Sequence, residues 1–191
     1  MGEIDFNSRL NNGLKKIKDR GVYTLVIAPE EYHLATEGIL IHLTKKLNKK
    51  GIYVILSRSC ESLPMKFTEL GIDPKVLYCI DGTGRSSGKG WQNKEGSTKN
   101  ATRIGNLHSL TELSLAITER SNTGEFQFLF FDSVTMLLLY NNAATIEKFI
   151  KYIADKMRYL NMGFLLIAIN EENSKKLFPI LSQFCDDYIS I

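Results

Sequence analysis

Short, uninterrupted apolar runs recur along the chain, separated by longer segments with a helical pattern. In most runs the apolar residues are continuous rather than alternating, which is typical of strands covered on both faces of a parallel sheet. This feature predicts a mostly parallel β-sheet with helices on each face. Five runs are strong, and a sixth at the end of the chain is weaker: residues 23–28, 52–56, 76–80, 126–131, 163–169 and 188–191.

The segments between the runs have the spacing of amphipathic helices. Leu40, Leu43 and Leu47 fall on one helical face, and Gly51 follows at the position of a C-cap glycine. Residues 146–160 carry apolar side chains at three- and four-residue spacing, which again predicts a helix with one buried face.

Strands that alternate with helices of this length form βαβ units, whose right-handed crossovers place helices on both faces of the sheet. A chain of 191 residues suits one domain with a substantial core. We therefore expect residues 1–191 to form a single α/β domain, a three-layer α/β/α sandwich around a mostly parallel sheet. Residues 1–20 are expected to form a leading helix.

Composition and charge exclude several classes of protein. The formal net charge of +3 is too small to indicate a nucleic-acid-binding protein by itself. No apolar run approaches the roughly 18 residues of a membrane span, and the first residues lack the apolar core of a signal peptide.

The chain has three cysteines, Cys60, Cys79 and Cys185, which are odd in number, far apart and without a CxxC pair. We therefore expect three reduced thiols in a cytoplasmic protein that has no membrane partner.

Residues 82–106 form a long, basic segment that is rich in glycine and serine and has no apolar periodicity. A P-loop needs G-x-x-x-x-G-K-[ST] between a strand and a helix, but Thr83 replaces the first glycine and Gly90 follows Lys89. Long connections are usually functional or disordered, so a solvated flexible loop and a nucleic-acid-binding loop both remain open. In a binding loop, Trp91 would stack on bases among four cations. These cations are Arg85, Lys89, Lys94 and Lys99.

Asp132 directly follows the apolar run 126–131 and precedes Ser133. Open α/β sheets bind ligands at the carboxyl ends of their strands, and in P-loop ATPases an aspartate at this position holds Mg²⁺. The alternative is that Asp132 caps the helix that follows. Asp81 ends another predicted strand and Arg58 follows a third, so both are candidates to line the same crevice.

Four segments together resemble the RecA-like P-loop ATPase superfamily, most closely its archaeal and bacterial KaiC-like branch. "VYTLVIAPEE" is similar to the first strand and nucleotide loop, and "LTKKLNKKGIYVILSRSCES" to the helix and strand that follow. "FTELGIDPKVLYCID" is similar to a helix ending in LGID before a strand ending in aspartate. "FLFFDSVTMLLLY" with "FIKYIADKMRYLNMGFLLIAINEE" is similar to the Walker B strand, the next helix and the next strand. The resemblance covers residues 22–191 and implies a RecA-like central sheet, a nucleotide-binding ancestry and contacts between subunits.

The segment that would hold the phosphates departs from this family. The loop after the first strand reads "APEEYHLATEGIL" instead of a Walker A motif. In one register His33 begins the three residues that replace Gly-Lys-Ser/Thr, and a shift by one residue preserves only Thr36. Neither register supplies the glycine or the lysine.

The same loop has the wrong chemistry for an anion. Pro29 has no backbone N–H to donate. One carboxylate of Glu30 or Glu31 at about 4 Å from a phosphate charge would cost about 4 kcal/mol at an effective dielectric near 20. We therefore carry over only Asp132, by position, and predict no catalytic residue and no cofactor. His33 and Glu37 are spaced i, i+4 but lack the second histidine of a zinc motif, so no metal site is expected.

The leading hypothesis is a RecA/KaiC-like domain that does not hydrolyse ATP and acts as a regulatory or scaffolding partner, either of itself or of an active relative. One alternative is a nucleic-acid-binding accessory protein of the recombinase-paralogue kind. A second is an ATP-binding KaiC-like ATPase with an atypical phosphate loop. A third is an enzyme that binds another ligand where Arg58, Asp81 and Asp132 converge.

Overall fold

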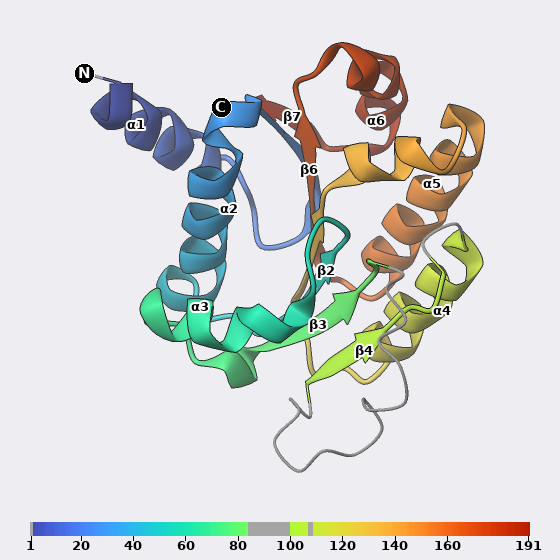
Figure 1. Ribbon diagram of the computed structural model, residues 1–191, viewed down its shortest axis with the longest axis horizontal. Helices are drawn as coiled ribbons and strands as arrows, with labels where there is room; N and C mark the ends of the chain where they lie inside the picture. Colours follow the sequence, from blue (N-terminus) through green and yellow to red (C-terminus); the bar gives the residue numbers. More distant parts are fainter. Residues whose placement is uncertain (1, 84–99, 107–108) are drawn as a thin grey trace.

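The computed structural model describes residues 2–83, 100–106 and 109–191, which fold around a seven-stranded sheet (Figure 1). The strand order is β4-β3-β2-β5-β6-β1-β7, and all neighbouring strands run parallel. The predicted parallel sheet is therefore confirmed. The strands are β1 (Gly21–Ile27), β2 (Gly51–Ile55), β3 (Leu77–Asp81), β4 (Ala101–Arg103), β5 (Phe128–Asp132), β6 (Gly163–Ile169) and β7 (Asp187–Ser190).

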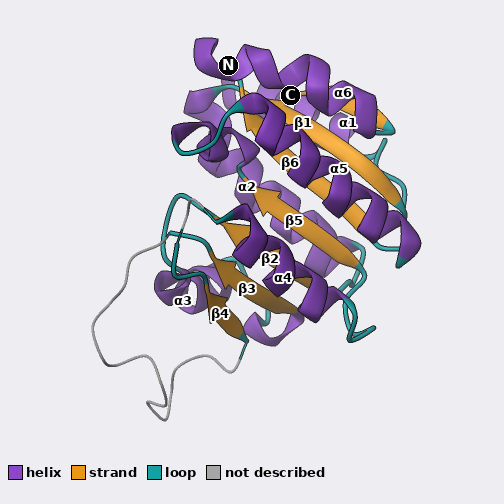
Figure 2. Ribbon diagram, turned by 90° about the vertical axis from the view of Figure 1, so that its right-hand side faces the viewer, coloured by secondary structure: helices purple, strands orange, loops and turns teal. Residues whose placement is uncertain are grey.

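Helices cover both faces of the sheet, which confirms the three-layer sandwich (Figure 2). One face carries α1 (Gly2–Leu14), α2 (Tyr32–Ile41) and α3 (Leu63–Glu69). The other face carries α4 (Leu110–Ser121), α5 (Ala143–Tyr159) and α6 (Phe178–Phe184). Shorter helical turns connect these elements: η1 (Pro29–Glu31), η2 (His42–Lys46), η3 (Cys60–Ser62), η4 (Pro74–Val76), η5 (Val134–Leu139) and η6 (Glu172–Leu177).

Successive residues of a strand point to opposite faces, and both faces are buried. In β1, Val22 and Val26 belong to the core beneath α4, α5 and α6. Tyr23, Leu25 and Ile27 belong to the core beneath α1, α2 and α3. Because either face excludes water, both sets of positions favour apolar residues, which explains the continuous apolar runs.

The edge strand β4 was not predicted. Its three residues, Ala101–Arg103, are half-buried and lie within the segment 82–106, where a long connection without strands was expected. They pair with Cys79–Asp81 of β3. Because its residues are only half-buried, this short strand does not need the apolar run that is typical of strands buried on both faces.

Two helix ends differ from the prediction. The leading helix α1 ends at Leu14 rather than continuing towards residue 20. The helix after β1 continues through a π-turn to Lys46, and Asn48, with φ +50°, takes the left-handed position that was assigned to Gly51. Gly51 instead begins β2, where a Cβ atom would lie only 2.2 Å from the ring of Phe128. Its small size is therefore needed for packing within the sheet.

Candidate functional site

Two aspartates end strands at the same level of the sheet. Ile55, the last residue of β2, pairs in register with Asp81 on one side and Asp132 on the other. Since neighbouring strands lie about 4.8 Å apart, the two aspartate Cα atoms are separated by about 10 Å. Both side chains are fully buried. The carboxyl edge predicted from the strand ends therefore exists, and it contains both acids.

Asp132 is held by two phenols. Tyr53 of β2 donates a hydrogen bond of 2.7 Å from its hydroxyl to Oδ2 of Asp132. Tyr32, the first residue of α2, donates to Oδ1 of the same carboxyl group. The Tyr32 hydroxyl also lies 3.3 Å from Oγ of Ser57. Each carboxyl oxygen of Asp132 thus has a protein donor, and Asp132 does not cap the following helix as one interpretation proposed.

Burial raises the pKa of Asp132, although the hydrogen bonds from Tyr32 and Tyr53 and the charge of Arg58 oppose the rise. Burial also raises the pKa of Tyr32 and of Tyr53 above the usual value, and the nearby Asp132 carboxylate adds to both shifts. The two phenols therefore remain protonated at neutral pH and keep donating to Asp132.

Of the two predicted crevice residues, Arg58 and Asp81, it is Arg58 that lies against Asp132 and its two tyrosines. Burial disfavours its cation, but the interactions with Tyr53, followed by those with Asp132 and Tyr32, outweigh burial and raise the pKa of Arg58. Its Nε atom is buried and has no hydrogen-bond partner among the residues that the structure describes. Ser133, the residue after Asp132, is also buried, and its Oγ has no hydrogen-bond partner within the described structure. The Asp132–Ser133 peptide bond is cis.

The chain becomes helical almost immediately after β1. Ala28 is extended, and the 3₁₀ turn Pro29–Glu31 leads directly into α2. The N–H of Glu31 donates to the carbonyl of Ala28 at 3.0 Å. The N–H of Tyr32 donates to the carbonyl of Pro29. Backbone donors that would have to converge on a phosphate are thus used within the turn itself.

The side chains expected at the phosphate position point elsewhere. Glu31 forms an ion pair of 2.5 Å with Arg9 of α1. Glu30 and His33 are exposed. Thr36 is buried and donates from Oγ1 to the carbonyl of Tyr32 at 2.9 Å. Glu31 and Thr36 are therefore engaged by other groups of the protein, whereas Glu30 and His33 are exposed.

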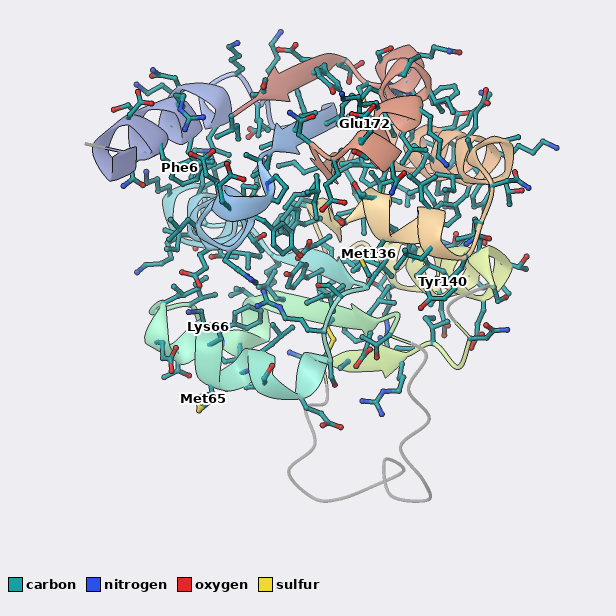
Figure 3. All side chains as sticks on the ribbon, turned by 45° about the horizontal axis from the view of Figure 1, so that its top comes forward. Phe6, Met65, Lys66, Met136, Tyr140 and Glu172 are labelled. Carbon is teal, nitrogen blue, oxygen red and sulfur yellow. A yellow bond between two sulfur atoms is a disulfide. The ribbon has the colours of Figure 1, made fainter. Side chains whose placement is uncertain are left out.

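Glu37 also has a partner outside any metal site. It lies 2.7 Å from Nζ of Lys66 on α3, which Figure 3 labels. Among the residues that the structure describes, no group of three His, Cys, Asp or Glu side chains is arranged to hold a metal ion. The predicted loop residues Arg85, Lys89, Trp91, Lys94 and Lys99 lie outside the described residues.

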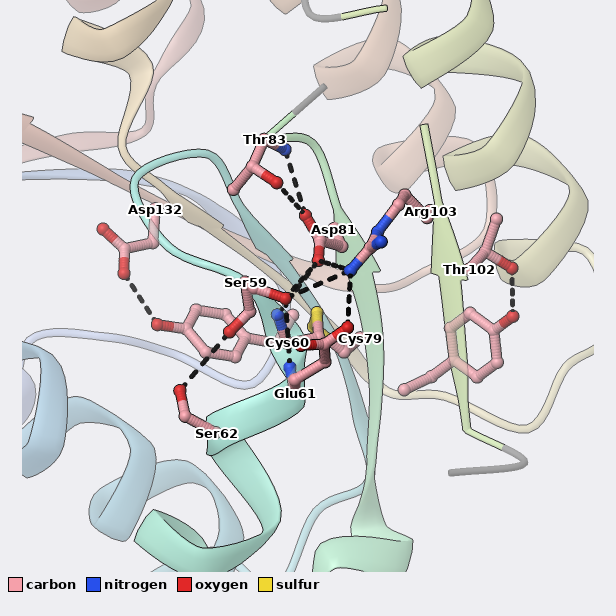
Figure 4. Close-up of a disulfide and its surroundings, with 12 residues drawn as sticks. Ser59, Cys60, Glu61, Ser62, Cys79, Asp81, Thr83, Thr102, Arg103 and Asp132 are labelled. Atoms are coloured by element: carbon pink, nitrogen blue, oxygen red, sulfur yellow. Dashed lines mark hydrogen bonds and ion pairs between the residues drawn. A yellow bond between two sulfur atoms is a disulfide. The ribbon is translucent and has the colours of Figure 1, made fainter. Parts of the chain in front are cut away.

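Asp81 has a separate set of partners (Figure 4). Its Oδ2 accepts hydrogen bonds from Oγ of Ser59 at 3.0 Å and from the N–H of Cys60 at 3.1 Å. The guanidinium of Arg103 on β4 lies 3.3 Å from the same oxygen. Oδ1 accepts from both the N–H and the hydroxyl of Thr83, at 3.0 and 2.7 Å.

Burial opposes ionisation of Asp81, but hydrogen bonds from Thr83, Cys60 and Ser59 outweigh burial and lower the pKa of Asp81. Asp81 is therefore an ionised carboxylate that ties the start of η3 and the edge strand β4 to the end of β3. Its partners differ from those of Asp132, so the structure brings Arg58 together with Asp132 but not with Asp81.

A disulfide joins Cys60 of η3 to Cys79 of β3, with the two Cα atoms 6.4 Å apart (Figure 4). The prediction of three reduced thiols is wrong for this pair. Sequence spacing did not reveal it, because the strand and the turn that bring the two residues together are 19 positions apart. Cys185 is free, and burial raises the pKa of its thiol to about 11.

The disulfide removes one argument for a cytoplasmic location, since disulfides are rare in that compartment. The described part of the chain contains no helix of the length and apolar character that a membrane crossing requires.

Sequence reasoning missed Tyr32, Tyr53 and Arg103. Tyr53 lies in the middle of an apolar run, where a buried phenol needs a hydrogen-bond partner, and this was the signal that could have been used. Tyr32 and Arg103 gave no local signal. They reach the carboxyl edge from α2 and from the unpredicted strand β4.

No protein-family description matches the sequence, and no curated protein matches it. The fold does match solved structures. One of them is a KaiC-like protein from the hyperthermophilic archaeon Pyrococcus horikoshii OT3, with a TM-score of 0.63 and 12% sequence identity. The match covers 90% of this chain and 72% of that chain. The chain thus shares the RecA-like P-loop fold of this KaiC-like protein.

Proposed function

We propose that this protein is a RecA/KaiC-like domain that does not hydrolyse ATP and that acts as a regulatory or scaffolding partner. The observation that supports this proposal is the position of Tyr32 at the carboxyl edge of the sheet. Its hydroxyl donates to Asp132, the carboxylate expected to serve Mg²⁺, while its backbone belongs to the helical turn that replaces a phosphate loop.

Phosphoryl transfer depends almost entirely on positioned donors and metal around the phosphates. Here Pro29 has no N–H, and the N–H groups of Glu31 and Tyr32 donate to backbone carbonyls. Recovery of a phosphate cradle would require this turn to unwind. The turn has no buried residues, so each of its backbone hydrogen bonds that is lost would cost about 0.5–1.5 kcal/mol, and nucleotide binding would have to overcome these losses.

A role through protein contacts agrees with the exposed apolar side chains of this chain. Leu34 in the first turn of α2 is 48% exposed, and Leu139 at the end of η5 is 65% exposed. Both belong to helical segments that start at the carboxyl edge. We expect the partner to be a second copy of this chain or an active RecA-like relative.

Calorimetry with Mg-ATP tests the loss of nucleotide binding. We expect no binding tighter than a dissociation constant of about 100 μM, or about −5.5 kcal/mol, and no phosphate release above that of a buffer blank. The matched variant Tyr32→Phe removes only the hydroxyl and should also remain inactive, because the backbone turn is unchanged. Tighter binding or turnover by the unmodified protein would contradict the proposal.

Light scattering across a concentration series, alone and with an ATP-hydrolysing RecA-like protein from the same cell, tests the scaffolding role. We expect either self-association or a mixed complex, weakened by Leu34→Asp but not by Leu115→Asp. Leu115 is a control of similar exposure (64%) on α4. A monomer that forms no mixed complex would reject the scaffolding role while leaving the nucleotide result unaffected.

A further inference from the structure

The amino edge of the sheet, opposite to the two aspartates, has a different chemistry. Gly51, Phe128, Gly163 and Gly21 pair in register across β2, β5, β6 and β1. Lys50 and Arg20 directly precede Gly51 and Gly21 in the chain. Three strand spacings of about 4.8 Å therefore separate the backbone positions of Lys50 and Arg20 by about 14 Å along the same edge.

Two basic runs meet at this edge, and we call them together the amino-edge surface. Residues 15–20 follow α1, and residues 45–50 lie at the end of the helix that continues α2. The surface carries eight cations and one acid, Asp19, against a net charge of +3 for the whole chain. The cations are Lys15, Lys16, Lys18, Arg20, Lys45, Lys46, Lys49 and Lys50, all exposed except the half-buried Lys49.

Specific contacts hold the two runs against each other. Nζ of Lys49 lies 2.7 Å from Oδ1 of Asp19, and Nζ of Lys46 donates to Oδ1 of Asn11 at 3.3 Å. Burial lowers the pKa of His42, and the charges of Lys46 and Lys49 lower it further. The lowered pKa of His42 thus reflects in part the positive potential of this surface.

The fold accounts for only part of this charge. Lys45 and Lys46 are in the last turn of a helix, where cations interact favourably with the helix dipole. Among the described contacts, Lys49 is the only cation of the surface that forms a salt bridge. Lys46 and Lys45 donate only to neutral oxygens, those of the Asn11 side chain and the Leu70 carbonyl. The positive charge of the surface is therefore largely uncompensated among the described residues, which fits a surface that binds an anion.

A hollow of about 350 Å³ adjoins the first run. Its lining includes the cations Lys16, Lys18 and Arg20 and the acids Asp186 and Asp187. Asp186 is engaged by Arg158 at 3.1 Å and by the N–H of Val22 at 2.7 Å, so its negative charge is partly compensated.

We propose that the amino-edge surface binds the phosphate backbone of a nucleic acid without sequence preference. Protein interfaces are depleted in lysine and rely on aromatic anchors, whereas nucleic-acid interfaces are polar and strongly positive. A flat anionic membrane would also face Asp186 and Asp187, which flank the hollow. A phosphodiester chain is narrow and can follow the two basic runs, residues 15–20 and 45–50, which the Lys49–Asp19 ion pair joins.

Fluorescence anisotropy with a labelled 20-base-pair duplex DNA, measured from 50 to 200 mM salt, tests the proposal. We expect binding at low salt that weakens steeply as salt increases, because each neutralised phosphate contributes about 0.9 to the log–log slope. The triple variant Lys15→Ala, Lys46→Ala, Lys50→Ala should bind about tenfold or more weakly, with a slope shallower by about 2.7. The control variant Lys75→Ala, Lys148→Ala, Lys176→Ala removes the same charge from exposed sites elsewhere and should bind like the unmodified protein.

Three results would overturn the proposal. One is the absence of DNA binding at 50 mM salt. Another is equal binding by the triple variant, which would place the contacts elsewhere, including residues 82–106. The third is a loss of DNA binding by the control variant to the same extent as by the triple variant.

Binding to phosphatidylserine vesicles and to polyglutamate is measured in parallel. If either is bound through the same three lysines while DNA is not, the surface serves a membrane or an acidic protein instead. Circular dichroism of each variant verifies that it is folded.

Discussion

Asp81 and Asp132 occupy equivalent positions, since each ends a parallel strand beside Ile55 and each is fully buried. The pKa values of the two groups are nevertheless shifted in opposite directions. The pKa of Asp81 is lowered, whereas the pKa of Asp132 is raised. Asp81 receives backbone N–H groups and faces a guanidinium, while Asp132 receives two neutral phenols. The position of an acid in a strand therefore does not decide the direction of its pKa shift, and the donors around it contribute to that direction.

This difference also separates two roles. The Asp81 group is a structural junction, reinforced by a disulfide between Cys60 and Cys79. The Asp132 group lies at the same carboxyl edge, where Arg58 and, more weakly, His33 act on its carboxyl group. We expect substitutions to affect stability mainly at the first group.

The largest expected effect is that of Asp81→Asn, which keeps the shape but removes the charge. We expect a loss of about 4 kcal/mol in the free energy of unfolding. Arg103 keeps its ion pair with Glu61 but loses its buried one. The amide NH2 of asparagine also cannot accept from the donors that now surround the Asp81 carboxylate. Asp132→Asn should cost only about 1 kcal/mol, because it faces neutral hydroxyls that can also accept. Urea unfolding at pH 7 measures both. A larger loss for Asp132→Asn would refute the comparison.

Reduction of the disulfide should have the next largest effect. The bond closes a loop with a sequence separation of 19, for which the chain-entropy estimate is about 3 kcal/mol. Urea unfolding with and without dithiothreitol gives the difference, and Cys185→Ser serves as a control with the pair intact. Thiol titration of the unfolded, unreduced protein should find one free thiol. A count of three would show that the pair is reduced.

The smallest effect concerns pH. A lowered pKa means that Asp81 contributes stability above its unfolded value of about 4, and this contribution disappears as pH falls through the folded pKa. A raised pKa means that Asp132 reduces stability as pH rises from about 4 through its folded pKa. The stability of the unmodified protein relative to Asp81→Asn should therefore rise between pH 3.5 and 7, and relative to Asp132→Asn it should fall. Slopes of the same sign would contradict the assigned pKa directions.

The local features of the fold were predictable from sequence. Six strands and the positions of Asp81 and Asp132 at strand ends follow from apolar runs and from the residues that directly follow them. Features that depend on distant partners were not predictable. Tyr32 meets Asp132 across 100 positions, and Arg103 meets Asp81 across 22 positions through a strand with no apolar run. Only the folded sheet brings these side chains together.

The position of Gly51 teaches the same lesson on a smaller scale. Its place after an amphipathic segment indicated a helix cap, but Asn48 takes that conformation, and Gly51 accommodates the ring of Phe128 from the neighbouring strand. A glycine has two physical uses, a left-handed backbone and the absence of a side chain. The sequence alone does not distinguish between them.

The two phenols on Asp132 also limit the protein in alkaline solution. Tyr32 and Tyr53 resist ionisation in the folded state, and burial raises the pKa of Tyr188 to about 12. Unfolded tyrosines lose their protons near pH 10, so base draws the chain towards the unfolded state by trapping it as tyrosinate. Tyr32 and Tyr53, which donate to Asp132 at neutral pH, are therefore also side chains whose deprotonation in strong base favours unfolding.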